Sequence, residues 1–300
     1  MKTYARVLSI AGSDPSGGAG IQADLKTFSA LGCYGMSVVC ALTAQNTQGV
    51  TGIHAVHVEF VRKQLEAVLS DVGVDAVKVG MLGSAEAVAV VAETLRRYAV
   101  EKIVVDPVMV AKGGHPLLPE EAVDAVRSLL LPMATVVTPN LPEASVLLGA
   151  PVRTADEMPD AGAALVRLGA RSALVKGGHL QKEVQEFRSS GVQNGVPPAV
   201  GSLSDSSDDC LVVRSGCCGG QCQESPVSMW FRHSRTVTRN THGTGCTLSS
   251  AIAATLAHGA SIPEAVKEAI DYTTGAIRAG AGYEFGHGHG PVHHFFRVWS

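Results

Sequence analysis

Residues 5–20 read ARVLSIAGSDPSGGAG, and residues 21–31 continue as IQADLKTFSAL. The stretch opens with a mostly apolar run, which is typical of a strand buried on both faces. A glycine-rich turn follows, and the apolar residues after it recur at helical spacing from Ile21 to Leu31. A strand, a tight turn and a helix in this order indicate an α/β fold built from βαβ units.

The same alternation of short apolar runs and helical patterns continues along the chain. The runs typical of buried strands are Ala5–Ala11, Met36–Leu42, Ala76–Val79, Ile103–Val105, Thr135–Val137 and Ala173–Val175. Helical patterns lie between them, and two more cover residues 247–256 and 263–279. We therefore expect a mostly parallel central sheet with helices on both sides, in one domain that spans residues 1–300.

Composition disfavours several classes of protein. A net charge of −3 gives no global attraction to nucleic acid. A hydrophobic fraction of 46% and a charged fraction of 17% are typical of a packed core, not of a disordered, charge-rich chain. No apolar run is long enough to span a membrane, and the stretch Val7–Ala11 ends in a turn, unlike a signal peptide. We expect a cytoplasmic protein that acts on a small molecule and binds neither nucleic acid nor membrane.

One segment does not fit this pattern. From about Gln181 to Arg235, serine, glycine and cysteine become frequent and helical periodicity vanishes. A flexible insertion, a mobile lid and a sequence artefact all stay open as explanations. Four of the seven cysteines lie here, at Cys210, Cys217, Cys218 and Cys222. Their spacing contains no C-x2-C pair, which disfavours a zinc site, and the odd total argues against a disulfide framework.

Polar features follow the first two strands. The turn Gly12–Gly20 lets a ligand approach the backbone and opens a helix N-terminus that favours anions, although a plain tight turn fits equally well. Asp24 is either a solvated residue on the helix flank or a carboxylate that accepts hydrogen bonds from a ligand in a cleft. Gln45 either contacts the edge of a heterocycle or belongs to a turn.

The later strands end in carboxylates and a lysine. Asp106 follows the fourth strand, and Asn140 and Glu143 follow the fifth. These side chains suit Mg²⁺, which typically takes one or two carboxylates plus phosphate oxygens. Asn140 and Glu143 also have the spacing of a helix cap, and both interpretations hold together. Lys176, beside two glycines, either meets a phosphate as a point charge or is a surface residue in a turn.

Residues 240–247, NTHGTGCT, form the most informative motif. Gly243, Thr244 and Gly245 give free backbone N–H groups at the start of a helix, and these form an anion hole suited to a transferring phosphoryl group. Cys246 lies where the helix dipole is expected to lower the pKa of a thiol, which makes it a candidate base for an attacking hydroxyl. A lone cysteine there is otherwise a small buried residue, but the neighbouring anion hole favours a catalytic role.

Together, these motifs resemble the hydroxymethylpyrimidine/phosphomethylpyrimidine kinase family of thiamine biosynthesis, which has the ribokinase-like fold. Each motif alone is a weak signal, but their order along the chain is highly specific. The matching segments are residues 11–27, 44–47, 78–82, 106–109, 138–144, 176–179, 240–249 and 286–292. The resemblance implies a three-layer α/β/α sandwich. In the family, a shorter piece with sheet strands and part of the nucleotide wall stands in place of residues 181–235.

The resemblance also implies an activity and a set of site residues. Two ATP-dependent phosphorylations occur at one site, first of the hydroxymethyl group of the pyrimidine and then of its monophosphate. The residues that would line the pyrimidine pocket are Gly12, Asp24, Gln45, Met81 and Val108. Those that would meet the nucleotide are Thr138, Asn140, Glu143, Lys176, Gly243 and Gly245. Mg²⁺ would be served by Asp106, Asn140 and Glu143.

Catalysis, by the same resemblance, would rest on Cys246, Gly243, Thr244, Gly245 and Lys176. Cys246 stands where the sugar-kinase relatives have an aspartate base, which points to the pyrimidine branch of the superfamily. The family is usually a homodimer, so the resemblance implies a second copy of this chain as a partner.

Three alternatives stay open. A pyridoxine or pyridoxal kinase acts on a hydroxymethyl-bearing aromatic ring of similar size. A non-catalytic pyrimidine-binding protein would keep the pocket while residues 181–235 spoil the nucleotide wall. A dinucleotide-dependent oxidoreductase is disfavoured because the chain lacks G-x-G-x-x-G and an evident acidic residue for the ribose.

Overall fold

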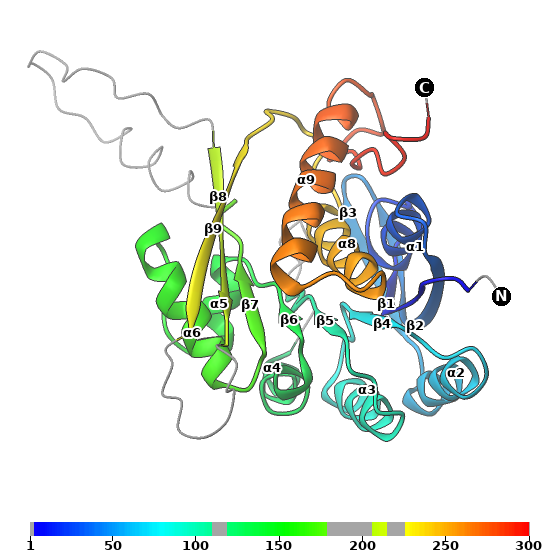
Figure 1. Cartoon of the computed structure of the whole chain (residues 1–300). Helices are drawn as coiled ribbons and strands as arrows, with labels where there is room; N and C mark the ends of the chain where they lie inside the picture. The colour runs from blue at the N-terminus through cyan, green and yellow to red at the C-terminus, as the bar shows by residue number, and fades with distance from the viewer. Residues whose placement is uncertain (1–2, 110–118, 179–205, 215–225, 300) are drawn as a thin grey trace, which may run out of the picture.

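The computed structural model describes residues 3–109, 119–178, 206–214 and 226–299. Within these ranges, nine strands form one sheet in the order β3-β2-β1-β4-β5-β6-β7-β8-β9 (Figure 1). The strands are β1 Arg6–Ser13, β2 Tyr34–Asn46, β3 Gly49–Ala55, β4 Ala76–Val79, β5 Ile103–Val105, β6 Val136–Val137, β7 Ser172–Val175, β8 Ser206–Val213 and β9 Val227–Ser234. Neighbouring strands from β2 to β7 are parallel, whereas β3, β8 and β9 extend the two edges in antiparallel pairing.

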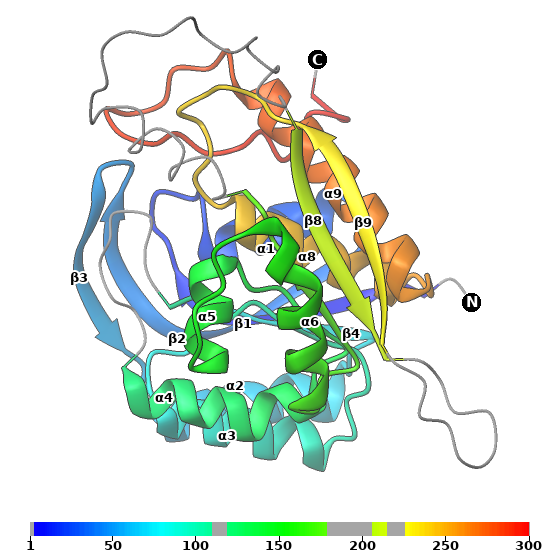
Figure 2. The ribbon, with the colours of Figure 1, turned by 90° about the vertical axis from the view of Figure 1, so that its left-hand side faces the viewer.

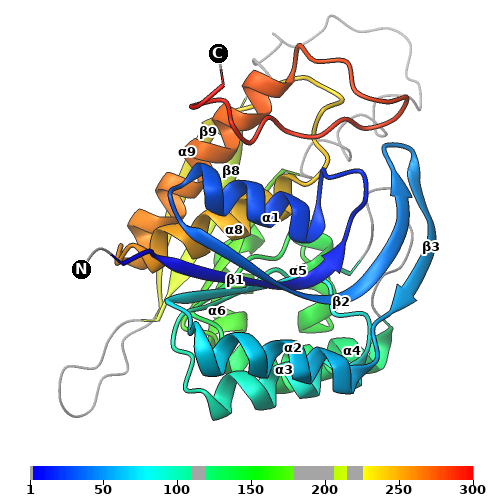
Figure 3. The same cartoon turned by 90° about the vertical axis from the view of Figure 1, so that its right-hand side faces the viewer.

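Helices cover both faces of the sheet. They are α1 Gly20–Ala30, α2 Val58–Asp71, α3 Ala85–Arg97, α4 Glu120–Ala125, α5 Leu141–Leu148, α6 Met158–Arg167, α8 Thr244–Ala257 and α9 Ile262–Gly280. α1, α8 and α9 lie on one face, and α2 to α6 lie on the other (Figures 1 and 3). In the ranges that the structure describes, no helix is both long enough and apolar enough to cross a membrane.

Successive residues of each central strand point to opposite faces of the sheet. Because helices cover both faces, these strands appear in the sequence as nearly continuous apolar runs. The core beneath α1, α8 and α9 receives Val7, Ala76, Val104, Val136 and Leu174. The core on the other face receives the residues that follow them, Leu8, Val77, Val105, Val137 and Val175. The expected three-layer α/β/α sandwich is therefore confirmed.

β3, β8 and β9 are missing from the strands predicted by apolar runs. β3 is a largely exposed edge strand, so it carries no such run. β8 and β9 lie side by side at the opposite edge of the sheet, inside the segment 181–235 (Figure 2). Regular structure thus occupies residues 206–213 and 227–234, in a segment whose order the sequence leaves open. Three cysteines of the segment, at positions 217, 218 and 222, lie outside the described residues.

Candidate active site

The carboxyl ends of β5, β6 and β7 bring the expected phosphate and metal residues together. Asp106, Thr138 and Lys176 each follow directly after one of these parallel strands, so they meet at one edge of the sheet. Thr138 Oγ1 donates to Asp106 Oδ1 at 3.1 Å, and Lys176 Nζ lies 3.4 Å from the same oxygen. Lys176 Nζ is also 3.9 Å from Glu143 Oε2. One ammonium group therefore faces two carboxylates.

Asn140 and Glu143 cap α5 and border the same cluster. The backbone N–H of Glu143 donates to Asn140 Oδ1 at 2.9 Å, and that of Asn140 donates to Glu143 Oε2 at 2.8 Å. This reciprocal arrangement confirms the helix cap that the spacing of Asn140 and Glu143 predicts. Burial raises the pKa of Glu143 to about 7, although Lys176 acts in the opposite direction. The carboxyl group of Glu143 therefore keeps its proton to a higher pH than an exposed glutamate does.

The two carboxylates differ in how their charge is balanced. Burial acts to raise the pKa of Asp106, but the ammonium groups of Lys176 and Lys78 outweigh it and hold that pKa below its ordinary value. A divalent cation fits this donor set, because Mg²⁺ takes one or two carboxylates together with phosphate oxygens. Within the described residues, no group of three or more His, Cys, Asp or Glu gathers around a common point to hold a metal. Phosphate oxygens and water would therefore complete the coordination.

The start of α8 lies against this cluster. Gly243 has a φ of 77°, and a Cβ atom there would lie 1.7 Å from the Gly18 oxygen, so only glycine fits. α8 then begins without a side-chain cap. The N–H of Thr244 donates to the Thr241 oxygen at 3.4 Å, so the N–H groups that follow it are the ones that face an anion. At Gly245 a Cβ atom would lie 3.6 Å from Lys176 Nζ and 3.8 Å from Asp106 Oδ2. The expected anion hole is thus directly beside the lysine and the carboxylate.

Cys246 directly follows Gly245 on α8, and two later serines of this helix bind buried carboxylates. Ser249 Oγ donates to Asp106 Oδ2 at 3.2 Å, and Ser250 Oγ donates to Asp24 Oδ1 at 2.7 Å. Burial raises the pKa of the Cys246 thiol to about 11. The expectation of a lowered pKa is therefore wrong, because desolvation of the thiol outweighs the groups that act to lower its pKa, the ammonium of Lys78 and the backbone N–H of Gly20.

Asp24, which we expect from the resemblance to contact the pyrimidine, is instead saturated by protein donors. Its side chain is fully buried. Lys78 Nζ donates to its two oxygens at 3.0 and 2.9 Å, and the hydroxyl groups of Ser9 and Ser250 donate at 2.6 and 2.7 Å. Four hydrogen bonds occupy the acceptor positions of a carboxylate. The structure thus contradicts direct contact between Asp24 and a ligand. The partner of Asp24 is the buried Lys78, for which the sequence suggests no role.

The other expected pocket residues lie at the ends of strands β1, β4 and β5. A Cβ atom at Gly12 would lie 2.5 Å from Met81 Cε, so these two residues are in contact and the glycine leaves room for the methionine. The backbone N–H of Val108 donates to the Asp106 carbonyl oxygen at 2.8 Å. That bond fixes the backbone of Val108 at the turn that carries the metal candidate Asp106.

Asp14 and His242 link the expected pocket residue Gln45 to the start of α8, and sequence reasoning gives neither a role. His242 Nε2 lies 2.8 Å from Asp14 Oδ2 and 3.4 Å from Gln45 Nε2. The Asp14 carboxylate also accepts the backbone N–H groups of Ser16 and Ala19 at 2.9 and 2.8 Å. Both residues lie inside quoted motifs, but only the fold shows that the first glycine-rich turn, the end of β2 and the start of α8 converge.

β8 adds a further residue from the unexpected segment. Asp209 Oδ1 accepts the backbone N–H of Gly177 at 2.9 Å, and its Oδ2 lies 3.2 Å from His233 Nε2 on β9. The buried carboxylate therefore fixes the turn that carries Lys176. No motif in residues 181–235 points to this contact, because it arises only when β8 pairs with β7.

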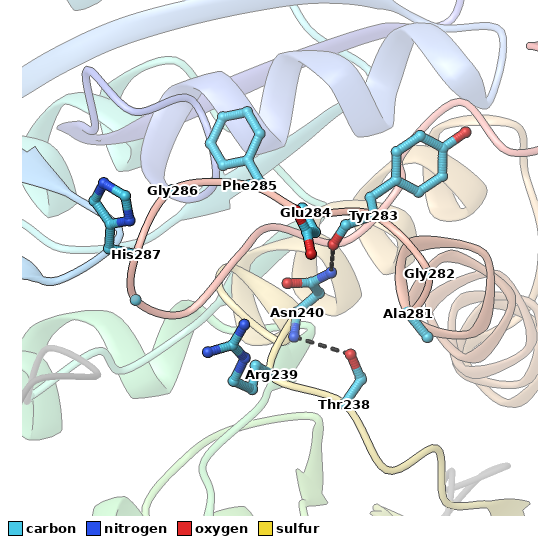
Figure 4. A pocket seen from close by; sticks show the side chains of 11 residues that line it. Thr238, Arg239, Asn240, Ala281, Gly282, Tyr283, Glu284, Phe285, Gly286 and His287 are labelled. Atoms are coloured by element: carbon cyan, nitrogen blue, oxygen red, sulfur yellow. Dashed lines mark hydrogen bonds between the residues drawn. The ribbon is translucent and has the colours of Figure 1, made fainter.

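A separate cavity of about 510 Å³ lies between residues 238–240 and residues 281–288 (Figure 4). Asn240 Nδ2 donates to the carbonyl oxygens of Gly280 and Tyr283 at 2.7 and 2.6 Å. These bonds join the walls of the cavity to the chain that leads into the anion hole. The cavity shares no residue with the expected pyrimidine, phosphate or metal positions.

An ammonium group and two carboxylates opposite a glycine-lined helix start suit the transfer of a phosphoryl group. On a three-layer sandwich with this sheet, the arrangement defines a kinase of the ribokinase-like class.

Comparison with known proteins narrows this class. The family model described as phosphomethylpyrimidine kinase matches residues 14–195 and 220–293. A hydroxymethylpyrimidine/phosphomethylpyrimidine kinase from Escherichia coli is 45% identical over 293 residues, which cover 97% of this chain and 98% of that protein. The crystal structure of phosphomethylpyrimidine kinase from Clostridium difficile is similar with a TM-score of 0.71 at 39% identity, over 91% of this chain and 99% of that one. The chain belongs to the phosphomethylpyrimidine kinase family and is a phosphotransferase.

Pyridoxal kinases share the fold at lower identity. The structure of the Staphylococcus aureus enzyme in complex with ADP has a TM-score of 0.81 at 32% identity, over 99% of this chain and 96% of that one. The fold is thus common to both kinds of kinase, and sequence identity favours the pyrimidine kinases.

Proposed function

We propose that this chain transfers the γ-phosphoryl group of ATP to the hydroxymethyl group of 4-amino-5-hydroxymethyl-2-methylpyrimidine, and then to the monophosphate so formed. The observation that carries the proposal is the glycine-lined start of α8. A Cβ atom at its Gly245 would lie 3.6 Å from Lys176 Nζ and 3.8 Å from Asp106 Oδ2, so the helix start borders both groups. The Escherichia coli relative that bears the pyrimidine kinase name is 45% identical to this chain, against 32% for the Staphylococcus aureus pyridoxal kinase in complex with ADP.

Backbone amides and Lys176 would stabilise the transferring group. The first N–H groups of α8 and the positive end of its dipole favour an anion at this point. Burial acts to lower the pKa of Lys176, but Asp106 and Glu143 outweigh it and hold that pKa above its ordinary value. Lys176 therefore stays charged when the phosphates arrive. One preorganised donor of this kind is typically worth about 10²–10³ in kcat.

Cys246 would receive the proton of the substrate hydroxyl. The hydroxyl oxygen forms a bond to the γ-phosphorus, the bond to the β,γ-bridging oxygen breaks, ADP leaves, and the proton passes to the sulfur. With a thiol pKa of about 11 the thiolate is a minor form at neutral pH, but it is a strong base when present. Phosphoryl transfer through a loose transition state needs little proton transfer in advance. Positioning and charge would therefore supply most of the catalysis.

Asp106, Asn140 and Glu143 are the residues that would hold Mg²⁺ with the nucleotide. Bound there, the cation neutralises negative charge on the phosphates. The two carboxylates are the stronger donors, because the side-chain oxygen of Asn140 already accepts the Glu143 N–H. Ionisation of Glu143, which burial opposes, would be favoured by such a cation.

Product analysis by mass spectrometry tests the proposal. The purified chain, Mg²⁺, ATP and the hydroxymethylpyrimidine should yield the monophosphate first and the diphosphate later. A matched sample of Lys176→Met should form neither at a comparable rate. Binding of the pyrimidine without any phosphorylated product would favour the non-catalytic binding protein instead.

Pyridoxal kinase is the second candidate, and the fold shared with the Staphylococcus aureus enzyme favours it. Values of kcat/KM for the pyrimidine and for pyridoxal, measured on the same preparation, distinguish the two activities. The homodimer implied by the resemblance stays a prediction. Light scattering coupled to gel filtration tests it, with a mass of twice 31.0 kDa expected.

A further inference from the structure

Lys78 is a charged residue in the centre of the sheet. It lies on β4 between Ser9 of β1 and Val104 of β5, and its side chain is 0% exposed. Lysine is almost never fully buried unless its charge is paired. Here the ammonium donates to both oxygens of Asp24 at 3.0 and 2.9 Å. The pair therefore lies inside the protein, below the helices α1 and α8.

The surroundings of Lys78 leave space for the ammonium on the pocket side. A Cβ atom at Gly80 would lie 2.9 Å from Lys78 Nζ, so glycine at this position keeps the space open. The next residue, Met81, contacts Gly12 at the end of β1. The ammonium of Lys78 thus lies against Gly80, the residue that directly precedes the expected pocket residue Met81.

The same pair faces the helix side that carries Cys246. α1 and α8 pack against each other over β1 and β4 (Figures 1 and 3). Ser250, which donates to Asp24, comes four residues after Cys246 and therefore shares its face of α8. Ser249, three residues after Cys246, donates to Asp106. Two buried carboxylates thus flank the helix face on which the sulfur lies.

The charges around Cys246 come from four elements. Asp24 on α1 and Asp106 after β5 are negative, and each acts to raise the pKa of the thiol beyond what burial does. Lys78 on β4 acts to lower it, as does the backbone N–H of Gly20. Lys176 after β7 instead pairs with Asp106 and Glu143, at 3.4 and 3.9 Å. Lys78 is therefore the cation that offsets Asp24 near the sulfur.

We propose that Lys78 is a positioning residue for phosphoryl transfer, which neutralises Asp24 beneath the pocket and so allows the Cys246 thiolate to form and accept the hydroxyl proton. The proposal rests on the proposed function, because the substrate hydroxyl of that reaction supplies the proton. In the step itself, the O–H bond of the substrate breaks and an S–H bond forms. The O–P bond forms as the bond to the leaving ADP oxygen breaks, so no other reactant is needed.

Alkylation of Cys246 by iodoacetamide tests this proposal without any turnover. The reagent reacts with the thiolate, and peptide mass spectrometry reads the rate at Cys246 separately from every other cysteine. We compare the full-length chain with Lys78→Met, Asp24→Asn and the double variant across alkaline pH. Lys78→Met should slow alkylation at fixed pH by about tenfold, Asp24→Asn should accelerate it, and the double variant should lie close to the unmodified chain.

The opposite signs separate an electrostatic role from a structural one. Loss of packing would expose the thiol and accelerate alkylation in every variant. Lys78→Arg should restore the unmodified rate if charge is what matters. Lys102→Met is the matched control, because Lys102 donates to the Leu256 oxygen at the far end of α8, and its rate should not change.

An unchanged or faster rate in folded Lys78→Met overturns the proposal. If that variant does not fold, Asp24→Asn decides alone, and a rate equal to or below that of the unmodified chain overturns it. If the alkylation rates do not follow the expected pattern but the products form normally, only the role of Lys78 is refuted. The expected alkylation pattern without product formation instead removes the kinase assignment.

Discussion

Glu143→Gln is expected to stabilise the protein at alkaline pH while lowering its activity. Burial raises the pKa of Glu143 from 4.5 to about 7, so the folded chain binds more protons than the unfolded chain between these values. The stability therefore falls as pH rises through this window and stays reduced above it. At roughly 1.4 kcal/mol per pKa unit, the ionised carboxylate costs about 3 kcal/mol at pH 8. Glutamine is neutral at either pH and keeps the acceptor that caps α5.

Urea unfolding at about pH 5 and about pH 8, without nucleotide or Mg²⁺, measures this effect. We expect nearly equal free energies of unfolding at the lower pH and a gain of up to about 3 kcal/mol for the variant at the higher pH. ADP release should fall, because a carboxylate for the cation is lost. Glu264→Gln is the control, since Glu264 occupies the same capping position in an exposed cap on α9. A variant less stable than the unmodified chain at both pH values would refute the reasoning, because the ion pair with Lys176 would then outweigh burial.

Three other substitutions test separate parts of the site. Cys246→Ala should lower kcat by about 10²–10⁴ without unfolding the chain, and a near-full rate of ADP release would exclude the sulfur as base. Gly243→Ala should lower the melting temperature far more than Gly259→Ala. A Cβ atom at the first position would lie 1.7 Å from a backbone oxygen and one at the second meets nothing within 4 Å, so equal shifts would contradict the packing described. Asp209→Ala should raise the KM for ATP about tenfold, because the turn that carries Lys176 loses an acceptor. An unchanged KM would show that β8 does not support the nucleotide site.

The sequence predicts the buried strands well and the edge strands poorly. The expected bounds Ala76–Val79 and Ile103–Val105 agree with β4 and β5, because strands covered on both faces are mostly apolar, with Lys78 as the exception in β4. β3 is exposed at an edge, so its composition resembles that of a loop. β8 has an apolar run at residues 210–213, but the unusual composition around it obscures that signal.

The site is predictable in its outline and not in its electrostatics. Residues that directly follow neighbouring parallel strands must meet, so the grouping of Asp106 and Lys176 follows from strand order. The partner of Asp24 is Lys78, which lies 54 positions away in the sequence, and no local pattern reveals that pair. The sequence places Cys246 at a helix start, where a lowered pKa is expected, but desolvation in the packed structure raises the pKa of the thiol, and no local pattern reveals that effect.

The assignment as a pyrimidine kinase is tested most directly by ADP release with Mg-ATP, offering the hydroxymethylpyrimidine and pyridoxal to the same preparation in separate reactions. We expect turnover with both kcat and kcat/KM in favour of the pyrimidine. Preference for pyridoxal, or binding of the pyrimidine with no ADP formed, would contradict the assignment.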